Sequence, residues 1–258
     1  MIILLPPSET KGYGTNVHKV NLSKLSFPAL KLIRSQTIES LIKLSSTPKK
    51  AIAVLGISQK QIHEVETNQE LLSAKTSPAI SIYSGVLFDA LDYKSLSKAS
   101  KNRADETLLI TSALFGLLKP QDAISHYRLS GDAVLPKIGS VAKLWIAPTD
   151  TVIRIEDPQL VVDMRSGVYA KFWQPQAELI DKTVVIKIMT KVGKGKSAKK
   201  IAISHSNKLT KGLLARDLVN LSKSPKSAQE LLKSLQTLKW NCELEKSANK
   251  PYLLEVFI

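Results

Sequence analysis

Four different polar side chains stand together near the start of this sequence, directly after a short apolar run. The motif PPSETK, residues 6–11, brings together the side chains of Ser8, Glu9, Thr10 and Lys11. Hydroxyls, a carboxylate and an ammonium are the groups that transfer protons and bind anions in functional sites. We predict that the two prolines end a strand, because proline lacks the ladder donor, and that the polar groups turn into a cleft. The alternative is a short turn capped by Ser8, with Glu9 and Lys11 in solvent.

Polar or glycine-containing signatures also follow three later apolar segments. These segments are 79–83, 107–114 and 159–164, and they run into SG, FGLLKPQD and RSG. The carboxyl ends of parallel strands gather in one crevice of a sheet, so we expect these signatures and residues 6–11 to share a cleft. The alternative is that each signature is an isolated turn.

The shared cleft has named candidates for catalysis and for its lining. If the protein is an enzyme, the catalytic candidates are Ser8, Glu9, Lys11, Asp122 and Tyr127. The expected lining residues are Tyr83, Gly85, Gly116, Ser166 and Tyr169. We expect Glu9 to pair with Arg128 or Arg165 and to hold that guanidinium for an anion. Asp122 has an alternative as a helix cap after Pro120.

The charge balance predicts a polyanionic partner. Lysine and arginine number 37 against 22 acidic residues, a net charge of +15, and residues 182–216 contain ten basic residues and no acidic one. Such a stretch needs a polyanion or distant carboxylates to balance it. We expect DNA, bound largely without sequence preference and strongly dependent on salt. The candidate phosphate ligands are Lys11, Lys119, Arg128, Arg165, Lys194, Lys196, Lys199, Lys200, Lys208, Lys211 and Arg216. Solvated lysines and a solvated loop at 191–200 are the alternative.

The segment TKVGKGKS, residues 190–197, looks like a phosphate-binding P-loop but fails that pattern. Thr190 stands where the loop needs glycine to wrap its backbone around phosphates. The residues that follow have strand character, whereas a P-loop opens a helix. We predict a β-hairpin with a basic tip here, and no nucleotide hydrolysis.

Several other classes of site find no support in the sequence. The single cysteine, Cys242, forms no internal disulfide, and the four histidines have no metal-ligand spacing, so we expect no metal and no cofactor. No apolar run is long enough to span a membrane, so no membrane partner is expected. The first residues lack the features of a signal peptide, which predicts a cytoplasmic protein.

The strands and helices that must position these residues alternate along the sequence, but not in a strict β-α-β order. We predict one α/β (α+β) domain over residues 1–258, with a mixed β-sheet flanked by helices. Strands are expected at 2–5, 79–83, 107–114, 159–164, 182–189, 199–204 and 252–258. Helices are expected at 27–46, 48–56, 58–74, 86–91, 141–148, 207–221 and 227–239.

Five blocks of sequence, in this order, resemble the YaaA family. They are PPSETK, YSGVLFDAL, SALFGLLKPQDAISHYRL, RSGVYAKFW and SHSNKLTKGLLARDLV. The resemblance covers nearly the whole chain and implies an unusual α/β fold with a helix-hairpin-helix-like element and a positively charged cleft. It also implies a role in peroxide resistance, a limit on free intracellular iron and DNA binding. An enzyme acting on a nucleic acid or nucleotide is the alternative function, with residues 6–11 in its active site.

Overall fold

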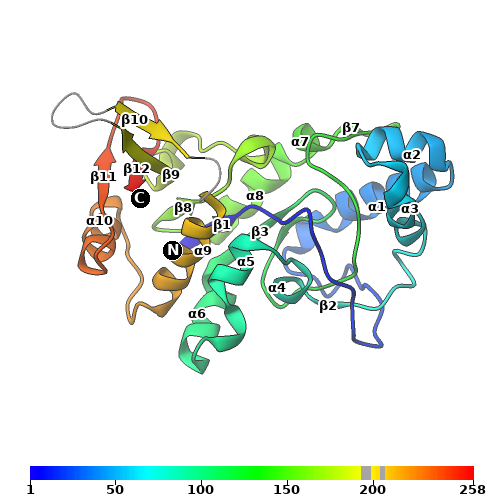
Figure 1. Ribbon diagram of the computed structural model, residues 1–258, viewed down its shortest axis with the longest axis horizontal. Helices are drawn as coiled ribbons and strands as arrows, with labels where there is room; N and C mark the ends of the chain where they lie inside the picture. The colour runs from blue at the N-terminus through cyan, green and yellow to red at the C-terminus, as the bar shows by residue number, and fades with distance from the viewer. Residues whose placement is uncertain (193–198, 204–206) are drawn as a thin grey trace.

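A mixed sheet forms the middle of the molecule. The computed structural model describes residues 1–192, 199–203 and 207–258, and Figure 1 shows how their elements are arranged. The described strands of the main sheet lie in the order β11 (Cys242–Glu245), β12 (Tyr252–Phe257), β9 (Thr183–Val192), β8 (Val161–Asp163), β1 (Ile2–Leu5), β3 (Leu108–Ser112) and β4 (Gly116–Leu118), with β10 (Lys199–Ala202) beside β9. Two small sheets pair β2 (Ser77–Pro78) with β5 (Ala123–Ile124), and β6 (Val134–Leu135) with β7 (Gly139–Ser140).

Five neighbouring strands of this sheet run in the same direction. β1 pairs in parallel with β3 and β8, β8 pairs in parallel with β9, and β9 with β12. All four residues of β1 are buried, as expected for a parallel strand that is covered on both faces. The carboxyl ends of β1, β3 and β8 therefore meet at the same edge of the sheet.

Helices cover the sheet in two groups. The described α-helices are α1 (Lys31–Ser45), α2 (Pro48–Leu55), α3 (Ile62–Gln69), α4 (Ala79–Ile82), α5 (Val86–Leu91), α6 (Lys98–Thr107), α7 (Val141–Leu144), α8 (Ile146–Glu156), α9 (Asn207–Asn220) and α10 (Ala228–Thr237). In Figure 1, α5, α6 and α9 stand together beside the sheet, while α1, α2 and α3 group at the opposite end from β10 and β11. One continuous set of buried apolar side chains joins the strands to both groups.

The contact between α5 and α9 explains a glycine in the helix interior. A Cβ atom on Gly212 of α9 would lie 2.2 Å from the backbone oxygen of Leu87 and 2.7 Å from Cβ of Ala90, both in α5. Only glycine lets the two helices approach this closely. Gly212 therefore packs against α5.

The predicted α/β fold with a mixed sheet is confirmed, and two predicted elements are wrong. In the predicted strand 79–83, residues Ala79–Ile82 instead form helix α4. The prediction failed because a short apolar run has no periodicity that distinguishes a helix from a strand. The helix expected to end at Pro148 instead breaks near Trp145, and Pro148 lies in the first turn of α8. Proline is tolerated there because the N–H groups of a first turn have no partner within the helix. Strands β9 and β10 pair antiparallel as predicted.

None of the helices in the described residues combines the length and hydropathy that a membrane-spanning helix requires.

Candidate functional site

A cavity of about 380 Å³ lies at the carboxyl edge of the parallel strands. It collects turns that are far apart in the sequence and the beginning of α9. Its described lining residues are Pro6, Pro7, Ser8, Glu9, Thr10, Ser84, Gly85, Val86, Leu87, Phe88, Ser166, Gly167, Val168, Tyr169, Asn207, Lys208 and Lys211. Three of the predicted signatures, PPSETK, SG and RSG, thus lie around one cavity.

Backbone contacts hold the first two of these turns together. Lys11 forms a β-bridge with Tyr83, and Ser84 N–H donates to the Thr10 carbonyl at 3.3 Å. Gly85 has a φ of +99°, a region that favours glycine, and a Cβ atom there would lie 3.3 Å from Ser8 Oγ. Glycine at position 85 therefore lets the chain turn into α5 beside the PPSETK segment.

Glu9 makes the predicted ion pair across the site. Its Oε2 atom lies 2.7 Å from Arg128 NH1, and the Tyr169 hydroxyl donates to its Oε1 atom at 3.4 Å. The Arg128 side chain is mostly buried, and its Nε atom has no hydrogen-bond partner among the described residues. The backbone of Arg128 is held by the Asn68 side chain. The Asn68 amide nitrogen donates to the Arg128 carbonyl, and Asn68 Oδ1 accepts from the Arg128 N–H. Glu9 thus orients a guanidinium that retains a free donor.

Lys11 lies next to this pair, is buried, and forms no ion pair with a carboxylate of the described residues. Its Nζ atom lies 4.4 Å from the centroid of the Tyr127 ring, and its one described hydrogen bond reaches the Glu9 carbonyl at 3.4 Å. Burial lowers the pKa of Lys11 to about 8, although the nearby Glu9 carboxylate raises it. The ammonium is therefore easier to deprotonate than that of an exposed lysine.

Three hydroxyls form a buried chain next to Lys11. The Tyr127 hydroxyl lies 2.9 Å from the Tyr83 hydroxyl and 2.9 Å from Ser112 Oγ at the end of β3. Burial raises the pKa of Tyr83 to about 12 and the pKa of Tyr127 well above its ordinary value. Both tyrosines are therefore neutral donors at physiological pH. Ser112 is a site neighbour that the sequence reasoning missed, because it lies within an apolar strand and carries no motif.

Lys211 is the second buried lysine, and it lines the cavity directly. Only 3% of its surface is exposed, and its Nζ atom lies 3.4 Å from the Arg165 carbonyl. Burial lowers its pKa to about 8, and the Asp163 carboxylate opposes this shift. Asp163 is occupied elsewhere, since its two oxygens accept from Arg165 Nε at 2.9 Å and Arg165 NH2 at 2.8 Å.

Several predicted site residues have structural partners away from the cavity. Arg165 is buried, and beyond Asp163 it donates to the carbonyls of Tyr169 and Trp173, so it braces the RSG turn and does not face the cavity. Asp122 accepts from Ser26 and from the Lys119 N–H, which makes it an anchor for local loops.

Three further predicted residues also lie outside the described cavity lining. Gly116 is buried in β4, where a Cβ atom would lie 2.5 Å from the Trp145 ring, so it cannot line a cleft. Arg216 donates to the Leu91 and Asp92 carbonyls at the end of α5. The Lys119 ammonium lies 5.6 Å from the centroid of the Phe27 ring.

Carboxylates from β11 and β12 balance part of the basic hairpin. Lys191 pairs with Glu243 at 2.8 Å, and Lys200 pairs with Glu243, Glu245 and Glu255 at 2.9, 3.2 and 2.6 Å. These three glutamates are close enough to share a cation, but the Lys200 ammonium already bonds all of them. Lys199 is exposed. The predicted ligands Lys194 and Lys196 lie outside the described residues.

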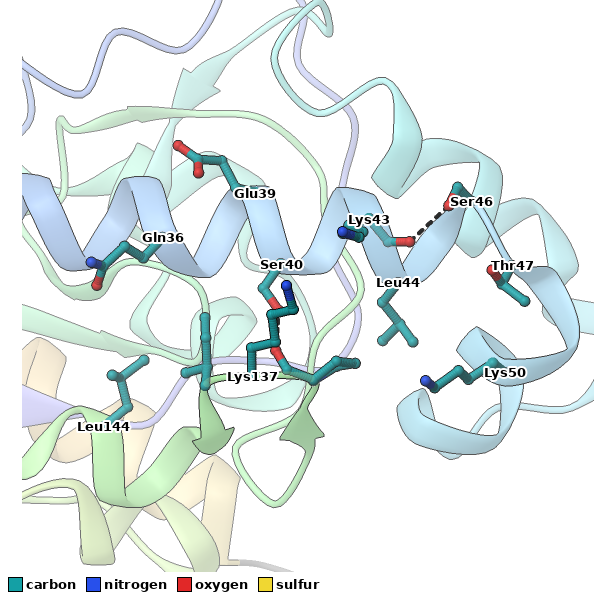
Figure 2. Close-up of a pocket in the computed structure, with 12 residues that line it drawn as sticks. Gln36, Glu39, Ser40, Lys43, Leu44, Ser46, Thr47, Lys50, Lys137 and Leu144 are labelled. Atoms are coloured by element: carbon teal, nitrogen blue, oxygen red, sulfur yellow. Dashed lines mark hydrogen bonds between the residues drawn. The ribbon is translucent and has the colours of Figure 1, made fainter.

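A larger cavity of about 620 Å³ lies away from these motifs, between α1, α2 and the β6–β7 turn. Figure 2 shows Lys50 and Lys137 extending toward this gap, with Leu44 and Leu144 beside it. Its lysines are solvent-exposed, and no residue predicted for the site lines it. Exposed lysines are solvated whether or not a ligand is present, so the smaller cavity, which is lined by the buried Lys211, is the better candidate.

The fold and the site together define an α/β protein with a cavity, lined by Lys208 and Lys211, at the carboxyl edge of its parallel strands. The family model described as peroxide stress protein YaaA matches residues 1–245. A UPF0246 protein of Streptomyces coelicolor is 36% identical over 262 residues, which covers 100% of this chain and 98% of that protein. A UPF0246 protein of Corynebacterium efficiens is 39% identical and covers 90% of both chains, and an uncharacterized protein of Campylobacter jejuni is 29% identical over 91% of this chain and 90% of its own. The chain therefore belongs to the YaaA family of peroxide stress proteins, as its motifs indicated.

Proposed function

We propose that this protein binds DNA without sequence preference, and that this binding serves the peroxide response by shielding DNA from iron-driven damage. The observation that supports the proposal best is the charge of the cavity. Its described lining includes Lys208 and Lys211, and its one carboxylate, Glu9, is paired with Arg128. Cationic groups without carboxylate partners attract phosphate, and a chain with a net charge of +15 is drawn to a polyanion over its whole surface.

Phosphate contacts of this kind position a protein on DNA but carry little sequence information. Lys208 is exposed in the first turn of α9, which leaves its ammonium accessible to a duplex backbone. Lys211 lies one turn further along the same helix and contributes positive charge from below the surface. Binding should therefore respond to salt more than to sequence.

Fluorescence anisotropy with two unrelated 20-base-pair duplexes tests the proposal. Each phosphate contact lowers the logarithm of affinity in proportion to the logarithm of salt concentration, with a slope of about −0.9 per contact. We expect similar affinities for both duplexes and a slope that falls by about one in Lys208→Gln. Lys143→Gln, an exposed lysine on α7, is the matched control and should leave the slope unchanged. Binding that ignores salt, or that differs tenfold between the duplexes, contradicts the proposal.

A second candidate function is an enzyme that acts on a nucleic acid or nucleotide. The observation that favours it is Lys11, which is buried beside the Tyr83 and Tyr127 rings and next to Glu9. Proton transfer is served by a lysine whose pKa is lowered to about 8 next to phenol groups, whereas phosphate binding needs only the positive charge.

The catalytic candidate is tested by turnover. Single-stranded DNA, duplex DNA and nucleotides would be incubated with the wild type and with Lys11→Met, and products would be separated by chromatography. Turnover that is lost in Lys11→Met and retained in Lys143→Met supports an enzyme. Turnover that survives in Lys11→Met removes Lys11 from the chemistry. Glu9→Gln should reduce ligand binding or turnover while the protein stays folded, because it releases the Arg128 guanidinium.

A further inference from the structure

Among the described residues, an acceptor without a hydrogen-bond partner and a buried cation without an ion pair belong to one helix that lines the cavity. Asn207 begins α9 and lines the cavity, and its Oδ1 atom is buried without a hydrogen-bond partner among the described residues. A buried acceptor that stays unsatisfied is costly and needs an explanation. A ligand that donates an N–H or O–H to this oxygen supplies one. Asn207 is not among the site residues predicted from the sequence.

The cation is Lys211, four residues further along the same helix. It is 3% exposed, and its single described hydrogen bond is 3.4 Å long and reaches a carbonyl. The nearest carboxylate, Asp163, already accepts two hydrogen bonds from the Arg165 side chain. Lys208 also lines the cavity, and residues three and four apart share one side of a helix. Asn207, Lys208 and Lys211 therefore offer two cationic donors and one acceptor to a single ligand.

The rest of the cavity wall combines apolar residues with polar ones, which are Ser8, Glu9, Thr10, Ser84, Ser166 and Tyr169. Pro6 and Pro7 come from the end of β1, Phe88 from α5 and Val168 from the RSG turn. These surfaces suit a flat ring, since ligand pockets are mostly apolar with a few polar groups that fix orientation. The volume of about 380 Å³ is near the lower limit of about 300 Å³ for small-molecule sites, and no double helix enters a space of this size.

We infer that this cavity binds one nucleoside monophosphate, with its phosphate on Lys208 and Lys211, its ring between the apolar walls and a ligand donor on Asn207 Oδ1. A nucleoside monophosphate combines the three features that the walls require: an anion, a flat ring and an N–H or O–H donor. The inference rests on the proposed function in one respect, the use of Lys208 and Lys211 as phosphate ligands.

Isothermal titration calorimetry at pH 7 tests the inference with four probes. They are deoxyadenosine 5′-monophosphate, thymidine 5′-monophosphate, inorganic phosphate and deoxyadenosine. We expect at least one nucleotide to bind at least tenfold more tightly than inorganic phosphate and than the nucleoside. Nucleotide binding no tighter than that of inorganic phosphate, or no nucleotide binding at millimolar concentration, overturns the inference.

Two variants assign the contacts. Asn207→Leu should weaken nucleotide binding about tenfold and leave inorganic phosphate binding unchanged, because it removes only the acceptor. Lys211→Met should weaken both, and it should remain folded because methionine replaces a buried cation without a carboxylate partner. Lys143→Met is the control for charge. Wild-type affinities in both site variants overturn the assignment.

The same proteins separate this inference from DNA binding. Nucleotide binding without duplex binding in the anisotropy assay removes the proposed function and keeps the cavity as a nucleotide site. Duplex binding without nucleotide binding removes the inference and keeps the proposed function.

Discussion

Replacing Lys11 by methionine should make the protein more stable at neutral pH. Its ammonium is buried, and the nearest carboxylate, Glu9, is paired with Arg128 at 2.7 Å. Burial lowers the pKa of Lys11 from 10.5 to about 8, which corresponds to a cost of about 3 kcal/mol in the free energy of unfolding while the lysine is charged. Methionine loses the contact with the Tyr127 ring, worth about 1 to 2 kcal/mol in a desolvated site. The expected net gain is about 1 to 2 kcal/mol.

The same reasoning predicts how stability changes with pH. Well below pH 8, Lys11 is protonated in both the folded and the unfolded chain, so the full cost of burial is present. Between pH 8 and 10.5 the folded chain loses this proton first, the unfolded chain binds more protons, and stability rises with pH. About 2 kcal/mol of the cost should be recovered between pH 7 and 9.5 in the wild type. Lys211 adds a similar rise.

Urea denaturation at pH 7 and 9.5 measures both effects, because the midpoint and slope give the free energy of unfolding. Lys211 is present in both proteins, so the difference between wild type and Lys11→Met isolates Lys11. Tyr83 does not interfere below pH 9.5, since burial raises its pKa to about 12. Lys143→Met, at an exposed site, should match the wild type at both pH values. A Lys11→Met variant that is less stable than the wild type at pH 7 and keeps the full pH dependence refutes the reasoning.

Three further predictions concern packing, a buried pair and the hairpin. Gly212→Ala should lower the free energy of unfolding by about 1 to 3 kcal/mol or more, because its Cβ atom would lie 2.2 Å from a backbone oxygen of α5. An unchanged urea midpoint would contradict the close contact between the two helices. Asp163→Asn should cost about 3 to 5 kcal/mol by leaving Arg165 buried without a counter-ion, and a loss below about 1 kcal/mol would show that its carbonyl partners suffice. Lys199→Gln should weaken DNA binding in anisotropy titrations, whereas Lys200→Gln should not, because three glutamates already neutralise Lys200; equal losses would count against this distinction.

Local sequence patterns were sufficient for the elements with strong signals. The run Ile2–Leu5 followed by two prolines predicted a buried strand that ends at Leu5, and the structure has that strand. The paired segments around the lysine-rich tip predicted the antiparallel β9 and β10. Where the signal was a short apolar run, as at 79–83, the sequence could not separate helix from strand. There the tertiary structure decides between helix and strand, because Ala79 N–H donates to the Asp122 carbonyl and Ile80 N–H donates to the Pro120 carbonyl.

For the site, motif chemistry identified several of the lining residues. The parallel-strand rule brought the PPSETK, SG and RSG turns to one cavity. Charge predicted that Glu9 would pair with Arg128 or Arg165 without deciding between them, and the structure has the pair with Arg128. The sequence could not show that Arg165 would form a buried ion pair with Asp163, two residues before it. Nor could it show that Gly116 would be covered by Trp145.

By itself the sequence determined the charge of the molecule, the family and the chemical groups available to the site, because these depend on residue types and on short motifs. Only the tertiary structure decided which cations stay without a counter-ion. Lys200 and Lys211 look alike in the sequence, yet one meets three glutamates from β11 and β12 and the other is buried beside a carboxylate already in use. The physical reason is that burial and ion pairing depend on contacts between residues far apart in the chain, and no local pattern encodes those contacts.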